Sequence, residues 1–258
     1  MVHYTGNFQF SEMLTGLIGD LNKPIYRFLA DRKWREYRRP VLMQRITQMK
    51  VFPDVFPQFE PIVDVKLAFG DRTVQPGEFV DSRISEKPFR LNVQLFERGE
   101  KLVTIIVVDP DVPNIEKDGF DSRCHFLAAN ISISPTLTSI YLAKLSEESQ
   151  TILPWYPPHA QKGSPYHRLS VFVFQQKDNT PIDVNIARSQ VRRENYNLRG
   201  FTARHLTKPI GVTMFRTKWD EGMADVMARA GAEGANMELK RKRVEPLPYK
   251  RRNPSSFR

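Results

Sequence analysis

The chain has few cysteines and no long apolar runs, the features that stabilise small secreted proteins and anchor proteins in membranes. Its 258 residues contain a single cysteine, Cys124, so no internal disulfide can form, which favours a reducing compartment. No apolar run approaches the roughly 20 residues that span a bilayer, and the N-terminus lacks the basic, apolar and small-residue order of a secretory signal. We therefore expect a soluble protein without membrane contact, with Cys124 buried in its apolar run rather than reactive.

Catalytic and metal-binding motifs are missing as well. The spacings of His, Asp and Cys match no zinc signature, and no hydroxyl nucleophile lies in a recognisable catalytic motif. An enzyme that uses Asp109, His125 and His167 for acid–base chemistry is therefore the weakest of the functions considered. We expect no catalytic residue, no metal, no cofactor and no small-molecule substrate.

What the sequence does have is the composition of a loop-rich β-protein. It contains nineteen prolines and seventeen phenylalanines, together with several short β-branched runs. Apolar and polar residues alternate over 89–96, which predicts a half-buried strand, whereas 102–108 is almost continuously apolar and predicts a strand buried on both faces. Further strands are predicted at 126–133, 169–175 and 210–216.

Helices are predicted before this β-rich region. Residues 11–22 and 24–39 have helical patterns, and Pro40 is expected to end the second helix. Trp34 and Tyr37 lie among cations in that helix, and we expect them to pack against a neighbouring element rather than to stack on bases.

Two more segments complete the prediction of secondary structure. The Pro- and Phe-rich stretch 51–61 should cover or enter the core. A last helix should follow Trp219-Asp220 and direct Met223, Val226, Met227 and Ala230 toward the core.

The excess positive charge is confined to the two ends of the chain. Residues 1–50 carry a net charge of +5 and residues 238–258 a net charge of +6, whereas 51–237 carry a net charge of −1. A neutral core with basic arms is typical of a domain adapted to a polyanion. Pro246 and Pro248 separate two basic clusters, so we expect an extended tail. A merely solubilising tail or a targeting signal is the alternative.

We assign RNA contacts to the basic residues of both arms, because Lys and Arg release the counterions that condense on phosphates. One group crowds the last turns of the predicted helix 24–39, and the other forms the two clusters of the tail. The predicted RNA-binding residues are Arg32, Lys33, Arg35, Arg38, Arg39, Lys240, Arg241, Lys242, Arg243, Lys250, Arg251 and Arg252.

Four residues in the centre of the chain form a candidate anion pocket: Asp109, Asp111, His125 and His167. The buried strand runs into Asp109-Pro110-Asp111, which we predict to be a rigid turn that ends the strand and aims both carboxylates. The two imidazoles would donate hydrogen bonds to an anion, and Asp109 would fix an imidazole tautomer by accepting its other ring N–H. The alternative is a satisfied polar cluster that holds two strand ends and a loop together.

These motifs resemble those of the phosphatidylethanolamine-binding protein family. The matching segments are Asp109-Pro110-Asp111, His125-Phe126-Leu127 and the loop from Pro157-Pro158 to His167-Arg168, and the likeness covers roughly residues 60–230. The resemblance implies a mainly β fold, an antiparallel β-sandwich with a small pocket for a phosphate-like anion. We therefore predict a helical basic extension over 1–60, a family domain with a C-terminal helix over 61–237, and a basic extended tail over 238–258.

The sequence departs from the family pattern around this pocket. Arg123 and Cys124 stand where the family has an aromatic residue and a further histidine, Leu169 replaces a tyrosine, and Met227 stands where an aromatic residue is common. The loop before His167 is about three residues longer. The resemblance therefore implies an altered or vestigial pocket.

A neutral domain of this family with a helical extension and a basic tail is similar to the members of the family that belong to the large subunit of the mitochondrial ribosome. That resemblance implies a structural, non-catalytic role in the mitochondrial matrix, bound to the ribosome at its central protuberance. Ribosomal RNA and other large-subunit proteins would be the partners. The alternative is a free soluble regulator that binds anions or phospholipid head groups, as the wider family does.

Overall fold

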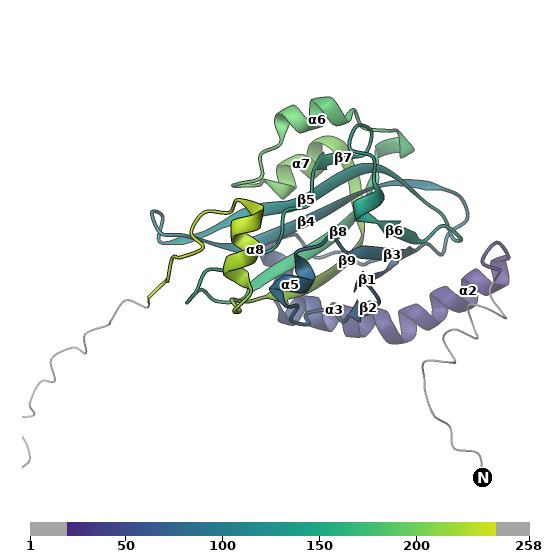
Figure 1. Cartoon of the computed structure of the whole chain (residues 1–258). Coiled ribbons are helices and arrows are strands. Elements are labelled where there is room, and N and C mark those ends of the chain that lie inside the picture. Colours follow the sequence, from purple (N-terminus) through teal and green to yellow (C-terminus); the bar gives the residue numbers. More distant parts are fainter. Residues whose placement is uncertain (1–19, 241–258) are drawn as a thin grey trace, which may run out of the picture.

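The computed structural model describes residues 20–240, which form two antiparallel β-sheets flanked by helices (Figure 1). The smaller sheet has the strand order β2-β1-β3-β6 and the larger one β7-β5-β4-β8-β9. The strands are β1 (Asp64–Phe69), β2 (Arg72–Val74), β3 (Arg90–Gln94), β4 (Lys101–Asn114), β5 (Gly119–Ile133), β6 (Ser139–Tyr141), β7 (Thr151–Leu153), β8 (His167–Gln176) and β9 (Leu206–Thr217). The predicted mainly β, antiparallel architecture is confirmed.

The main hydrophobic core lies between the two sheets. Val65 and Leu91 of the smaller sheet share one cluster of buried side chains with Val103, Ile105 and Val107 of β4. The even-numbered residues of the same strand, such as Ile106 and Val108, belong to a second buried cluster. Successive side chains of a strand point to opposite faces. The prediction that 102–108 is buried on both faces is therefore confirmed.

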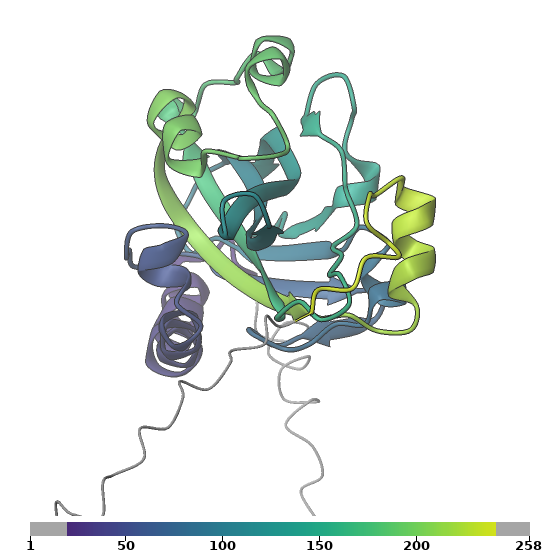
Figure 2. The same ribbon diagram turned by 90° about the vertical axis from the view of Figure 1, so that its left-hand side faces the viewer.

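Helices cover the outer face of the larger sheet (Figure 2). The second cluster includes Leu42 and Ile46 of α3 and Phe201 of α7. Val51 and Phe52 are buried in it too, so the segment 51–61 enters the core as predicted. The helices of the described residues are α2 (Pro24–Lys33), α3 (Arg39–Gln48), α4 (Val51–Asp54), α5 (Ser82–Ser85), α6 (Val184–Gln190), α7 (Leu198–His205) and α8 (Met223–Ala230), with a π-helical turn (Trp34–Arg38) and 3₁₀ turns at Leu142–Lys144 and Lys177–Asn179.

The N-terminal helix does not end at Pro40, and that prediction is wrong. A π-helical turn over Trp34–Arg38 joins α2 to α3, and the Arg39 N–H donates to the carbonyl of Trp34, five residues back. Proline cannot donate an N–H and its ring crowds the carbonyl four residues before it. The wider turn lets the helix pass Pro40 without that clash.

The two aromatic residues of this turn have different surroundings. Trp34 is buried against Phe96, with ring centroids 5.3 Å apart, as predicted. Tyr37 is 67% exposed, so the prediction that it packs against a neighbouring element is wrong. The difference arises because the π-helical turn buries one side only, and Trp34 is its one buried residue.

The strand β4 continues through the Asp109-Pro110-Asp111 motif to Asn114, so the predicted strand end is also wrong. Its pairing with β5 shifts register between Asp109 and Val112, which is a β-bulge or a similar irregularity. A bulge tolerates a residue that cannot donate to the ladder, and this explains how Pro110 lies inside a strand.

The last helix, α8, is confirmed, with Met223, Val226 and Met227 buried. Gly231 ends it in the left-handed region, at φ 65°. Residues 231–240 then run back over the loop that precedes β8, and we call them the strap. The predicted helix at 11–22 and the tail beyond Lys240 lie outside the described residues, apart from a turn at 20–22. No helix of the described range is long and apolar enough to cross a membrane.

Candidate functional site

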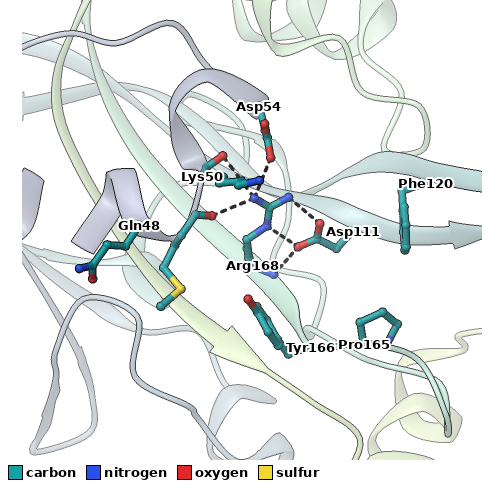
Figure 3. Close-up of a pocket in the computed structure, with 9 residues that line it drawn as sticks. Gln48, Lys50, Asp54, Asp111, Phe120, Pro165, Tyr166 and Arg168 are labelled. Atoms are coloured by element: carbon teal, nitrogen blue, oxygen red, sulfur yellow. Dashed lines mark hydrogen bonds and ion pairs between the residues drawn. The ribbon is translucent and has the colours of Figure 1, made fainter. Parts of the chain in front are cut away.

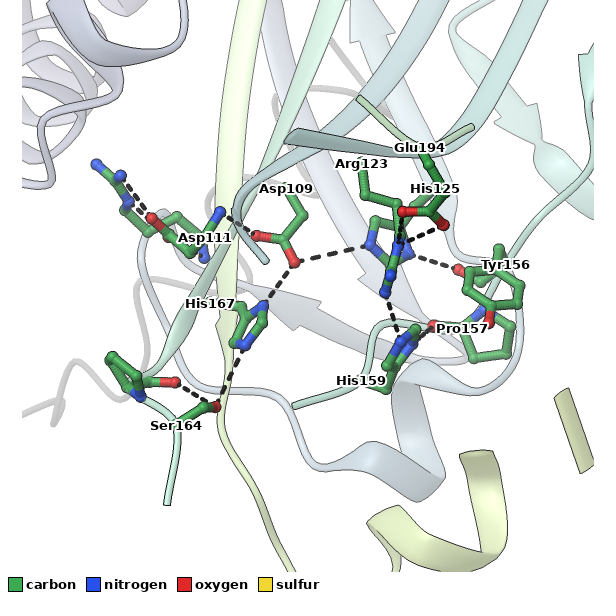
Figure 4. Close-up of polar contacts among 12 residues, drawn as sticks. Asp109, Asp111, Arg123, His125, Tyr156, Pro157, His159, Ser164, His167 and Glu194 are labelled. Carbon is green, nitrogen blue, oxygen red and sulfur yellow. Dashed lines mark hydrogen bonds and ion pairs between the residues drawn. The ribbon is translucent and has the colours of Figure 1, made fainter. Parts of the chain in front are cut away.

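Three of the four predicted pocket residues meet at one end of the larger sheet. Asp109, His125 and His167 lie on β4, β5 and β8, which are neighbours in the strand order β5-β4-β8. The pairing of these strands brings together side chains that are up to 58 residues apart in sequence. We call this group the Asp109 centre (Figure 4).

The Asp109 centre is a buried arrangement of one carboxylate and two imidazoles. The Nδ1–H of His167 donates to Oδ2 of Asp109 over 2.6 Å, and Nε2 of His125 lies 3.8 Å from the same oxygen. All three residues are at most 2% exposed. Burial by itself would raise the pKa of Asp109, but the charge and hydrogen bond of His167, together with the nearby imidazole of His125, outweigh it and hold that pKa well below its ordinary value.

The imidazole N–H groups are already used inside the protein. Nδ1 of His125 lies 2.8 Å from the carbonyl of Tyr156, which can only accept, so Nδ1 carries a proton and donates it there. His167 uses its Nδ1–H for Asp109, and its Nε2 lies 3.4 Å from Oγ of Ser164. The predicted role of Asp109 in fixing a tautomer agrees with this geometry. The donors expected to hold an anion, however, face protein atoms.

A second layer, which the sequence analysis missed, lies beside the Asp109 centre. Arg123 donates from Nε to both carboxylate oxygens of Glu194, over 2.8 and 2.9 Å, and its Nη1 lies 2.5 Å from Nε2 of His159. His159 in turn donates from Nδ1 to the carbonyl of Pro157 over 3.1 Å. Nε2 must therefore carry a lone pair that accepts the N–H of Arg123, and the imidazole is neutral. Burial, reinforced by the charge of Arg123, lowers the pKa of His159 to about 3.

The strap closes this end of the sheet. The Leu239 N–H donates to the carbonyl of Lys162 over 2.7 Å. Gly163 has a φ of +84°, and a Cβ at that position would lie 2.1 Å from the carbonyl oxygen of Leu239. Only glycine fits there, because the loop before β8 and the strap are in direct backbone contact. The longer loop before β8 is thus covered by the strap and does not form an open entrance to a pocket.

The residues that depart from the family pattern are all buried away from solvent or bonded within the protein. Leu169 is fully buried between the sheets. Met227 packs with Ala160 under the strap. Cys124 is buried, and burial raises the pKa of its thiol to about 12, which agrees with the expected unreactive role.

Asp111 does not join the other three pocket residues. Its carboxylate accepts from the backbone N–H, Nε and Nη2 of Arg168, over 3.0, 2.7 and 2.7 Å (Figure 3). The Nη1 of Arg168 also donates to the carbonyl of Met49 and to Asp54. These hydrogen bonds, with Asp111 first, raise the pKa of Arg168. Arg168, oriented by Asp111, therefore ties the segment between α3 and α4 to the larger sheet.

The predicted RNA-binding arginines of the N-terminal helix are each paired with a carboxylate. The pairs are Arg32–Glu36 (2.8 Å), Arg35–Asp31 (2.8 Å), Arg38–Asp64 (2.7 Å) and Arg39–Glu60 (2.7 Å). Lys33 forms no ion pair within residues 20–240. Lys240 is exposed at the end of the strap. Arg241, Lys242, Arg243, Lys250, Arg251 and Arg252 lie outside the described residues.

The comparisons with known proteins agree with this fold. "Large ribosomal subunit protein mL38" of Schizosaccharomyces pombe is 28% identical over 233 residues, which are 89% of this chain and 72% of that protein. "Putative odorant-binding protein A5" of Drosophila melanogaster is 23% identical over 70% of this chain and 81% of that protein.

Two solved structures share the fold at low sequence identity. They are a phosphatidylethanolamine-binding protein from Plasmodium vivax and a carboxypeptidase Y inhibitor complexed with its cognate proteinase. Their TM-scores are 0.53 and 0.52 and their identities 16% and 13%; the matches cover 69% and 70% of this chain and 97% and 96% of those chains. A family model described as phosphatidylethanolamine-binding protein matches residues 69–213, more than half of the chain, and the protein therefore belongs to that family.

Proposed function

We propose that this protein is a non-enzymatic structural component of the large subunit of the mitochondrial ribosome, located in the mitochondrial matrix. The similarity to the mL38 protein of Schizosaccharomyces pombe carries this proposal. It extends over 233 residues, whereas the family model matches only 69–213, so the likeness includes segments outside the common family domain. The match to the odorant-binding protein of Drosophila melanogaster is shorter, at 184 residues.

The closed Asp109 centre supports a structural role. Its imidazole N–H groups are bonded to protein atoms, its three side chains are buried, and the strap covers the neighbouring loop. Ligand pockets need polar groups that face the ligand, and here such groups face one another. Asp109, His125 and His167 are therefore proposed as a vestigial anion site that now stabilises the fold, whereas Asp111, predicted with them, serves Arg168 instead.

The proposed partners are ribosomal RNA and neighbouring large-subunit proteins, at the central protuberance. The segment from Lys240 to Arg252 has seven Lys or Arg and one acidic residue, a composition that repels itself until phosphates neutralise it. The N-terminal arginines support RNA contact less strongly, because each already has a carboxylate partner. The domain limits 1–60, 61–237 and 238–258 remain part of the proposal.

Sedimentation tests the proposal directly. A tagged protein in a mitochondrial lysate should move through a sucrose gradient with the large ribosomal subunit, and an unrelated tagged matrix protein should not. A free regulator that binds anions or phospholipid head groups would instead stay near the top, as expected of a 30.0 kDa protein. That outcome would replace the ribosomal proposal with this alternative, which the family membership favours.

The RNA contact of the tail has its own test. If about five of its cations reach phosphates, affinity for RNA should fall with a log–log salt slope of roughly −4. Replacing Lys240, Arg241, Lys242 and Arg243 with alanine should flatten this slope as well as weaken binding. The matched control replaces Arg32, Arg35, Arg38 and Arg39 with alanine, which removes the same charge from paired sites and should change the slope less. An unchanged slope in the tail variant would reduce the tail to a solubilising or targeting segment.

A further inference from the structure

An exposed tyrosine stands beside a group of cations that form no ion pair within the described part of the domain. Tyr166, in the loop before β8, is 43% exposed. Its ring meets that of Phe79 edge to face, with centroids 5.9 Å apart. The guanidinium of Arg216 lies 3.9 Å from the Phe79 centroid and 5.1 Å from that of Tyr166. The ring of Tyr166 is thus held in place although much of it faces solvent.

Four cations surround these rings without a carboxylate partner. Arg45, Lys50, Arg216 and Lys218 form no ion pair within residues 20–240. Arg216 donates from Nε to the carbonyl of Gly77 over 2.7 Å, and the side chain of Arg45 packs on the same glycine. Lys218 lies 5.3 Å from the Phe79 ring centroid. Their charge is therefore available to a ligand, unlike that of the paired arginines in the N-terminal helix.

A cavity of about 420 Å³ opens beside Tyr166 (Figure 3). Gln48 and Lys50 line it on one side of Arg168, and Phe120, which is 59% exposed, lines it on the other. Cavities of about 300–1,000 Å³ hold small ligands, so a nucleotide fits this volume. The carboxylates of Asp54 and Asp111 also line it, but both accept hydrogen bonds from Arg168.

These features match the chemistry that recognises single-stranded nucleic acid. Such sites combine aromatic rings, on which bases stack, with cations that follow the backbone phosphates. In RNA recognition, unpaired bases are also hydrogen-bonded at their edges, a role that the Gln48 amide can serve. An acidic peptide would use the four cations but would leave the exposed ring and the cavity unused.

We infer that this surface, defined by Tyr166, Phe79, Arg45, Lys50, Arg216 and Lys218, binds single-stranded RNA by stacking one unpaired base on Tyr166 within the cavity. The inference rests on the proposed function, because it takes RNA to be the partner. It adds a contact on the folded domain, separate from the basic tail. The phosphates on either side of the stacked base would lie near the four cations.

The test measures how Tyr166→Ala changes the affinity of the full chain for a fluorescent single-stranded 12-mer RNA, by anisotropy. Stacking losses of the usual size predict weakening by about five- to 150-fold with an unchanged salt slope. Tyr166→Phe should keep most of the affinity. Lys218→Ala should reduce the magnitude of the slope by about 0.7–0.9, as for one phosphate contact.

Tyr141 provides a matched control. It is also 43% exposed, and Arg90 and Lys144 lie 5.7 and 4.8 Å from its ring centroid, but it does not line the cavity. Tyr141→Ala should leave RNA affinity within about twofold, on the expectation that stacking is confined to Tyr166. Thermal melts should show that each variant is folded.

Several outcomes would overturn the inference. These are equal losses for Tyr166→Ala and Tyr141→Ala, no loss for Tyr166→Ala, no RNA binding by the wild type, or equal competition by a poly-glutamate peptide. The proposed function stands or falls separately. A wild-type protein that sediments with the large subunit while Tyr166→Ala binds RNA normally would retain the function and remove this site. RNA binding through Tyr166 by a protein that does not sediment with the subunit would retain this site and remove the proposed function.

Discussion

Asp109 and Asp111 are two residues apart, yet they serve opposite sides of the larger sheet. Asp109 faces the space between the sheets and bonds to His167, whereas Asp111 faces the helices and bonds to Arg168. In a regular strand, residues two apart point to the same face. The register shift between Asp109 and Val112 separates them. One short motif therefore supplies a buried carboxylate, Asp109, to the core between the sheets. It supplies a partly exposed carboxylate, Asp111, to the side of the sheet that the helices cover.

The comparison shows how burial determines the contribution of a polar contact to the stability of the fold. The Asp109 side chain is 1% exposed, and that of Asp111 is 16% exposed. A charge removed from water depends on its partners, whereas a partly hydrated charge can exchange them for solvent. The two sides should therefore respond differently to mutation, to pH and to added anions.

The largest effect is expected from Asp109→Ala. The change leaves the Nδ1–H of His167 buried without an acceptor, and loss of one partner of a buried ion pair costs about 3–5 kcal/mol. Urea unfolding at pH 7 measures the free energy of unfolding. Asp111→Ala is the matched control and should cost less, because water can reach Arg168. Equal losses of unfolding free energy for the two variants would contradict the distinction between the buried side of Asp109 and the partly exposed side of Asp111.

A smaller loss, about 2–3 kcal/mol, is expected from Arg168→Ala, since its guanidinium makes several charge-assisted hydrogen bonds. The variant removes the hydrogen bonds that hold the segment between α3 and α4 to the larger sheet, so the loss should be accompanied by faster hydrogen exchange around Met49. Arg168→Lys should recover only part of the stability, because an ammonium cannot form the two-pronged contact with Asp111. Full recovery by lysine would show that charge alone matters there.

The enclosed side should also make the protein sensitive to acid. The pKa of His159 is about 3 in the folded protein and about 6.5 in an unfolded chain. Between these values only the unfolded chain takes up the proton, so stability is present above pH 6.5 and is lost as the pH falls toward 3. One proton corresponds to at most about 1.4 kcal/mol per pH unit.

The measurement for this prediction is the unfolding free energy between pH 7 and pH 4.5. His159→Gln should flatten the dependence, and the wild type should show the steeper one. The depressed pKa of Asp109 adds a further loss only below about pH 4, where the unfolded carboxyl takes up its proton first. A His159→Gln variant with the same slope as the wild type would contradict the neutral, buried imidazole.

The smallest effect is expected from added phosphate or phosphoethanolamine. Because the imidazole N–H groups of the Asp109 centre are bonded to protein atoms, calorimetry should detect little or no binding heat. Micromolar binding that His167→Ala abolishes would show that the centre opens, and it would favour the alternative function.

The sequence predicted the strands and three members of the Asp109 centre because these depend on local patterns and on motif order. Continuous apolar residues marked β4, and the family likeness brought Asp109, His125 and His167 together. Asp111 was assigned to the wrong group, because no local pattern marks a register shift. His159 and Glu194 were missed for a related reason, since their roles depend on where Arg123 points after folding.

The paired arginines show the same limit. A run of cations in a sequence indicates basic character, but their carboxylate partners lie one helical turn away in two cases and 21 or 26 residues away in the others. Composition counts charge without showing which charges are free. Arg45 and Lys218 belong to no run of cations in the sequence, yet they form no ion pair in the described structure.

The π-helical turn at Trp34–Arg38 also sets the rotational phase of the N-terminal helix. An α-helix advances by about 100° per residue. The one extra residue in a π turn therefore rotates α2 by about that angle about the helix axis, relative to α3. Leu42 and Ile46 beyond the turn face the core, whereas Ile25, Phe28 and Leu29 before it face solvent. Deletion of one residue within the turn would restore regular pitch and rotate that apolar stripe of α2 by roughly a quarter of a revolution relative to the sheets.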